Sequence, residues 1–147
     1  MNVKAIKFMM EEFGLKNRTK FFGNGQQVIE FVDSMTKLEK KSKRDVKKRQ
    51  PIALILLDIN MPILNGFETM ATLNERFGLE DYSDIVRPVI CYLTQIDGQG
   101  LKPFLAPNEV ADYVLQKPMP ALELVGLLKL LSIKVQSNQT LALSIQL

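Results

Sequence analysis

Short apolar runs alternate with amphipathic stretches along this chain, and the alternation predicts an α/β fold. The run from Ile52 to Leu57 has no polar position, so it predicts a strand covered on both faces, as in a parallel sheet. Three further strands and five helices are predicted from the same periodicities: strands over about 18–22, 88–93 and 112–116, and helices over 2–13, 26–38, 67–77, about 99–106 (weak) and 120–131. Strands and helices that alternate in this way predict a doubly wound parallel sheet with helices on both faces.

Polar residues stand at the ends of three predicted strands. Asp58 follows the apolar run, Thr94 ends the next strand, and Lys117 ends the last. Because the carboxyl ends of parallel strands meet at one edge of the sheet, we expect these side chains to converge in one crevice, and we expect Thr94 and Lys117 to carry little packing. A carboxylate there can bind a cation or act as a nucleophile, and a hydroxyl and an ammonium beside it suit a phosphoryl group carried on it.

Three motifs resemble those of one family, the receiver domains of two-component response regulators. They are the string Asp58-Ile-Asn-Met-Pro through Gly66, the strand ending at Thr94, and Tyr113 followed by Lys117-Pro118. The similarity runs from residue 1 to about 131, and residues 24–26 resemble the family's turn into its second helix. The resemblance implies a flavodoxin-like fold and a role in phosphorelay signalling.

The resemblance also implies roles for five residues. Asp58 would be the phospho-acceptor, and the backbone carbonyl of Asn60 would join it as a ligand of Mg²⁺, the cofactor that the family uses. Thr94 would be the switch hydroxyl, Tyr113 the rotating aromatic, and Lys117 the phosphate-contacting lysine before a cis proline.

The chain departs from the family's pattern at its beginning. Receiver domains open with a strand that ends in two acidic residues, which hold the Mg²⁺. Here residues 2–13 already resemble the family's first helix, ended by Gly14 as a C-cap, so the first strand and its acidic pair would lie upstream of Met1. A hard cation takes several oxygen ligands, and Asp58 with one carbonyl is a poor site. We therefore expect weak Mg²⁺ binding and slow phosphorylation of Asp58.

The last residues offer a substitute for the missing strand. The receiver-like domain spans residues 1–133, and in the tail 134–147 large apolar residues occupy every second position of 140–147, which predicts a strand. In the strand order 2-1-3-4-5 of this fold the first strand is central. We hypothesise that 140–147 fills this slot, like a circular permutation. The alternative is a disordered or loosely packed tail.

Charge is concentrated in an insertion over 39–50. Residues 37–49 have a net charge of +6, whereas the whole chain has +3, so the rest of the chain is acidic by −3. The segment would suit docking of an acidic partner. A solvated insertion between helix and strand is the alternative. Because no aromatic residues are interleaved with the charges, we do not expect this domain to bind nucleic acid.

Composition excludes several kinds of site. The chain has no histidine, which excludes Ser–His or Cys–His catalysis, His-ligated zinc and a phosphohistidine within the chain. The single Cys91 excludes an internal disulfide and is expected to pack in a buried strand. No apolar run is long enough to span a bilayer, and no signal peptide is visible, so we expect a cytoplasmic location.

Three hypotheses about function follow. In the first, the domain, as part of a hybrid histidine kinase or a response regulator, accepts phosphate on Asp58 from a histidine kinase or a phosphotransfer protein, and is not itself an enzyme. In the second it is a pseudo-receiver that acts only as a protein-interaction module. In the third it is an inactive truncated fragment.

Overall fold

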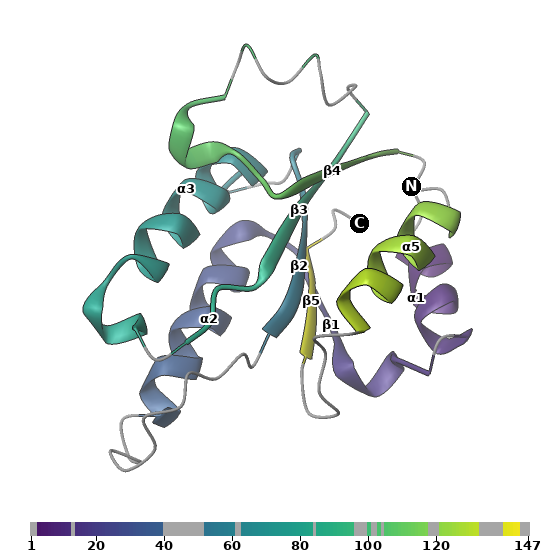
Figure 1. The fold of residues 1–147 in the computed structure, drawn as a ribbon, viewed down its shortest axis with the longest axis horizontal. Helices are drawn as coiled ribbons and strands as arrows, with labels where there is room; N and C mark the ends of the chain where they lie inside the picture. The colour runs from purple at the N-terminus through teal and green to yellow at the C-terminus, as the bar shows by residue number, and fades with distance from the viewer. Residues whose placement is uncertain are drawn as a thin grey trace.

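The fold is a five-stranded parallel sheet between two layers of helices (Figure 1). The computed structural model describes residues 3–12, 14–39, 52–60, 63–83, 85–95, 100, 103, 105–117, 121–132 and 140–144. The strands are β1 (Thr19–Phe22), β2 (Ile52–Asp58), β3 (Val89–Thr94), β4 (Tyr113–Gln116) and β5 (Thr140–Ser144). The helices are α1 (Val3–Glu12), α2 (Gly25–Glu39), α3 (Gly66–Phe77) and α5 (Ala121–Ser132), with the 3₁₀ turns η1 (Lys16–Arg18), η2 (Glu80–Tyr82) and η4 (Pro107–Glu109).

The last strand of the chain lies in the middle of the sheet. The strand order is β1-β5-β2-β3-β4, and β5 pairs in parallel with β1 on one side and β2 on the other. Leu143, for example, is level with Phe21 of β1 and Leu56 of β2. The hypothesis that 140–147 fills the slot of the family's first strand is thus confirmed for residues 140–144. The observed order matches 2-1-3-4-5, with β5 in the position of strand 1.

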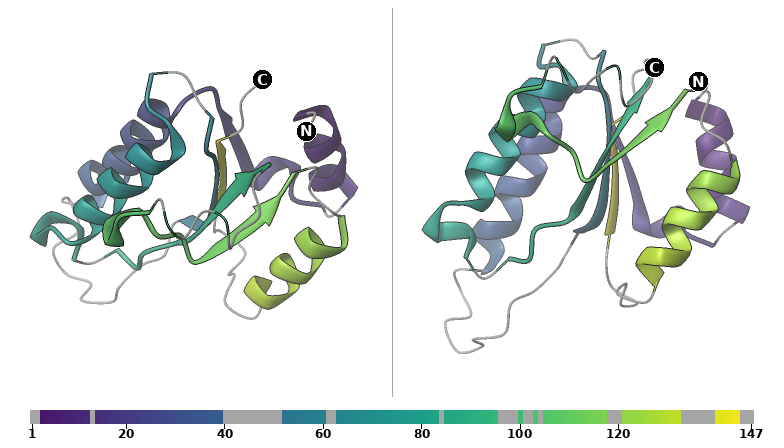
Figure 2. Two further views of the ribbon diagram at one scale, coloured as in Figure 1. Left: turned by 90° about the horizontal axis from the view of Figure 1, so that it is seen from above. Right: turned by 45° about the horizontal axis from the view of Figure 1, so that its top comes forward.

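The apolar run of β2 forms the centre of the core. All seven of its residues are buried, and alternate side chains point to opposite faces. Leu54 and Leu56 pack with α1 and α5, whereas Ile55 and Leu57 pack with α2 and α3. Figure 2 shows the same division, with α1 and α5 on one side of the sheet and α2 and α3 on the other. The prediction of a strand covered on both faces is confirmed.

Local signals in the sequence set the helix ends. Gly14 adopts φ +69 and its N–H donates to the Glu11 carbonyl, which confirms the predicted C-cap of α1. The Asn24 side chain accepts from the Gln27 N–H at the start of α2, so the predicted turn at 24–26 is also present. Burial raises the pKa of Cys91 to about 12, in keeping with a packing role.

Some predicted features lie outside the described residues. They include the basic insertion over 40–50, half of the weak helix over 99–106, and Pro118 with its expected cis peptide bond. Among the described helices, none is long and apolar enough to cross a membrane.

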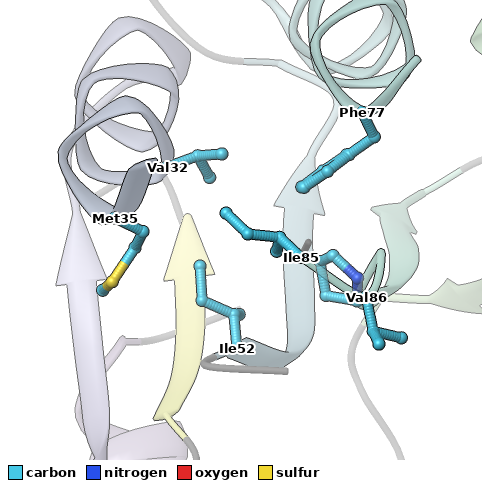
Figure 3. A pocket seen from close by; sticks show the side chains of 7 residues that line it. Val32, Met35, Ile52, Phe77, Ile85 and Val86 are labelled. Carbon is cyan, nitrogen blue, oxygen red and sulfur yellow. The ribbon is translucent and has the colours of Figure 1, made fainter. Parts of the chain in front are cut away.

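A small apolar pocket lies at the amino end of β2, between α2 and the end of α3 (Figure 3). Its lining includes Val32 and Met35 from α2, Ile52 from β2 and Phe77 from α3. Ile52 and Asp58 are the first and last residues of β2, so the pocket is remote from the predicted crevice.

Replacing Leu143 by proline tests the central position of β5. Proline removes a backbone N–H and is poorly tolerated in a central strand, so Leu143→Pro is expected to lower the free energy of unfolding by about 3 kcal/mol or more. Leu143→Val, which keeps the backbone pairing, is the control. Urea unfolding followed by circular dichroism measures both. Equal stability of Leu143→Pro and the wild type would contradict the central placement.

Candidate functional site

Three strand ends meet at the carboxyl edge of the sheet, as predicted. Asp58 ends β2 level with Leu93, Thr94 ends β3, and the Lys117 N–H donates to the Thr94 carbonyl at 2.6 Å. Asp58 and Thr94 are both buried, with 1% and 5% of their surface exposed. The expectation that Thr94 carries little packing is therefore wrong, because Thr94 lies within the core rather than on a solvated rim.

Asp58 and Lys117 form a buried ion pair. Lys117 Nζ lies 2.5 Å from Asp58 Oδ2, and only 2% and 13% of the Asp58 and Lys117 side chains, respectively, are exposed. The other carboxylate oxygen, Oδ1, accepts the Asn60 N–H at 3.1 Å. Both oxygens of Asp58 thus have donors, which a buried carboxylate requires.

A tight loop connects Asp58 to α3. The Gly66 N–H donates to the Ile59 carbonyl, and a Cβ on Gly66 would lie 2.8 Å from both the Asp58 carbonyl oxygen and the Ile59 Cα. Glycine is therefore required by close approach of the helix start to the end of β2. Asn65 and Glu68 form a reciprocal capping box at the same helix start.

The start of α2 packs directly on this loop. A Cβ on Gly25 would lie 1.8 Å from Thr69 Oγ1 and 2.8 Å from the Leu64 carbonyl oxygen. The turn at 24–26 therefore packs against the connection between β2 and α3, and this packing leaves no room for a side chain at Gly25.

The structure does not bring Tyr113 to the crevice. Tyr113 starts β4, is 44% exposed, and is level with Cys91 on the α1 and α5 face. Val114 instead packs with Tyr92 on the other face of the sheet. Thr94 lies on that same face, because it is two residues after Tyr92 in β3. The predicted switch role of Tyr113 gains no support from this placement.

Tyr92 is an aromatic residue near the crevice that the sequence analysis did not single out. It is fully buried two residues before Thr94, stacks edge-on against Phe67 of α3, and donates its hydroxyl to the Glu109 carbonyl of η4. Burial raises its pKa, so the hydroxyl stays protonated and able to donate. The signal in the sequence that could have pointed to Tyr92 was an aromatic residue within a predicted buried strand.

The described residues do not fit a Mg²⁺ ion. Within the described residues, no three acidic, cysteine or histidine side chains form a group that could hold a metal. The strand in the slot of the family's acidic strand offers no carboxylate, because residues 133–147 contain neither Asp nor Glu. Of the predicted ligands, Asp58 already binds Lys117, and one carbonyl from Asn60 is too little for an ion that takes six oxygen ligands.

The comparisons with known proteins support the fold. No family model matches the chain, and no curated protein matches it. One similar structure is the signal receiver domain of a signal transduction histidine kinase from Syntrophus aciditrophicus, with TM-score 0.59, 23% identity, and coverage of 98% of this chain and 88% of that one.

A second similar structure is the receiver domain of the sensor histidine kinase PA1611 from Pseudomonas aeruginosa PAO1, which has a magnesium ion coordinated in its active site cleft. It aligns with TM-score 0.54 and 20% identity over 86% of this chain and 84% of that one. The chain therefore has the flavodoxin-like α/β fold of a receiver domain, as its motifs predicted.

Substitution of Gly66 tests the tight approach of α3 to Asp58. Gly66→Ala is expected to destabilise the fold by about 1–3 kcal/mol, because the added methyl group meets backbone atoms. Gly126 in α5 is the matched control, since a Cβ there meets nothing within 4 Å. Gly126→Ala should stabilise by about 0.5–1 kcal/mol. Chemical denaturation measures both, and equal effects would refute the close approach.

Ile63 provides a test of strain in the same loop. It adopts φ +68, which is unfavourable for a β-branched residue, and is 80% exposed. Ile63→Asn should raise the free energy of unfolding by about 1 kcal/mol, because asparagine tolerates this conformation. Val110, exposed with φ −76, is the control: Val110→Asn should change stability by less than about 0.5 kcal/mol. An unchanged stability of Ile63→Asn would argue against strain at this position.

Proposed function

We propose that this domain is a receiver in a phosphorelay and that Asp58 is its phospho-acceptor. The observation that carries the proposal is the buried Asp58–Lys117 pair at the meeting of three strand ends. The receiver fold supports it, and a carboxylate is a suitable nucleophile for phosphoryl transfer. The donor would be a phosphohistidine of a histidine kinase or phosphotransfer protein, because this chain has no histidine of its own. In this role the domain is a substrate of the transfer rather than an enzyme.

The residues around Asp58 suit this step in specific ways. The Asn60 N–H holds Oδ1, and the Lys117 ammonium lies beside Oδ2, where it would contact an oxygen of the transferred group. Thr94 ends the adjacent strand and offers a hydroxyl to the same group. The buried surroundings keep bulk water from the acyl phosphate once it has formed.

A pseudo-receiver that acts only through protein contacts is the second candidate. It is favoured by one observation: the central strand β5, which stands where the family places its acidic strand, comes from a segment without carboxylates. A site without that negative charge has little attraction for a dication, and phosphoryl transfer depends on charge compensation. In this reading the basic segment 37–49 is a candidate contact for an acidic partner.

Treatment with acetyl phosphate distinguishes the two candidates. If Asp58 is the acceptor, intact-mass spectrometry should detect one added phosphoryl group, which Asp58→Asn removes. Phosphorylation should be slower than that of a magnesium-binding receiver domain by on the order of a hundredfold, since one source of charge stabilisation is absent. A folded protein that never gains the group, even from a phosphorylated phosphotransfer protein, would contradict the acceptor role and favour the interaction module.

A further inference from the structure

The charge balance of the crevice points to a site that works without a divalent cation. We infer that the Lys117 ammonium takes the place of Mg²⁺ as the counter-charge of Asp58, so that Mg²⁺ neither binds in the crevice nor accelerates its chemistry. This inference deepens the proposed function, but its first test does not depend on phosphorylation.

The cation position beside Asp58 is already filled by Lys117. Lys117 Nζ lies 2.5 Å from Asp58 Oδ2, with the two side chains only 13% and 2% exposed. A Mg²⁺ ion on Asp58 would have to displace this ammonium from a buried carboxylate or stand beside it as a like charge. Displacement loses a charge-assisted hydrogen bond and leaves the ammonium without its counterion, whereas a Mg²⁺ ion beside the ammonium is repelled by it.

Nothing described near Asp58 would offset the loss of its hydrogen bond to Lys117. Mg²⁺ gives up its waters reluctantly and is usually held by one or two carboxylates together with substrate phosphates, whereas Asp58 is already paired with Lys117. The order of the sheet places β5 directly beside β2, and Ser144 is level with Leu57, one residue before Asp58. The residues that lead up to and follow that point, 133–147, include no acidic side chain. Among the described residues, the charges of Asp58 and Lys117 therefore balance each other.

Phosphoryl transfer to Asp58 can be written without a metal ion. With acetyl phosphate, an oxygen of the Asp58 carboxylate forms a bond to phosphorus while the bond between phosphorus and the acetyl oxygen breaks, and acetate leaves with the electron pair. No proton is transferred. The Asn60 N–H orients Oδ1, and the Lys117 ammonium compensates the charge on the phosphoryl oxygens as the new bond forms.

Mg²⁺ titration of the full chain is the first test. The wild type should show no heat of binding and no rise in thermal melting temperature beyond that of Asp58→Asn, the matched control. A second variant, Ser144→Asp, introduces a carboxylate at the last residue of β5, level with Leu57. It should gain Mg²⁺ binding that depends on Asp58. Mg²⁺ binding by the wild type as tight as by this variant would overturn the inference, whatever the outcome of phosphorylation.

The rate of phosphorylation by acetyl phosphate is the second test. Rates in excess EDTA and in excess Mg²⁺ should agree within about twofold, whereas sites that use a metal for charge compensation respond much more strongly. Lys117→Met should abolish the modification in both conditions, and Lys117→Arg, which keeps the charge, should retain part of it and serves as the folding control. A rate that rises about tenfold or more with Mg²⁺ would contradict the inference. Failure of phosphorylation in every condition, without Mg²⁺ binding, would reject the acceptor role and leave the metal-free site in place.

Discussion

The parallel pairing of β5 between β1 and β2 is the constraint on which the rest of the structure depends. Without β5, the edge strand β1 has no neighbour in the sheet, and the hydrogen-bonding groups of β2 on that side have no partner. Pairing in register also aligns the carboxyl ends of the strands, which places Asp58, Thr94 and Lys117 at one edge. The ends of β2, β3 and β4 form the site, and β5 completes the sheet directly beside it.

The presence of β5 in the position of the family's acidic first strand changes the electrostatics of the site. A strand that completes the hydrogen-bonded sheet need only supply backbone groups and compatible side chains, whereas a metal site needs carboxylates at one end of it. β5 meets the first requirement by pairing on both sides, and its segment carries no carboxylate for the second. The ion pair between Asp58 and Lys117 is the arrangement that remains, with neutral charge balance and both Asp58 oxygens bonded.

Much of this fold could be predicted because its signals are local. The unbroken apolar run of β2 indicated a doubly covered strand, and Gly14 marked a helix end that the structure confirms. The alternation of apolar residues in 140–147 indicated a strand. Which strands it pairs with could be inferred only because the family's central first strand was missing from the expected order. Pairing between segments more than eighty residues apart leaves no local mark in the sequence.

The parts of the site that could not be predicted depend on strand register and burial. Tyr113 was assigned its switch role because Tyr113 with Lys117-Pro118 resembles a motif of the family. A shift of one residue along a strand reverses the face, however, and Val114 lies on the face that Thr94 shares. The depth of Asp58 and Thr94 in the core was also missed, because a strand end is expected near the surface. Tyr92, buried against Phe67, was hidden within an apolar run that predicted only packing.

Amide hydrogen exchange of β5 is the most direct measurement of the central claim that this strand completes the sheet. If it does, the slowly exchanging amides among Leu141, Ala142 and Leu143 should match the protection of amides at Leu54–Leu56 in β2, and both sets should exchange only through global unfolding. Exchange of all the β5 amides at the rate of exposed loop residues, while β2 stays protected, would contradict the account, because it would show that the sheet is stable without β5.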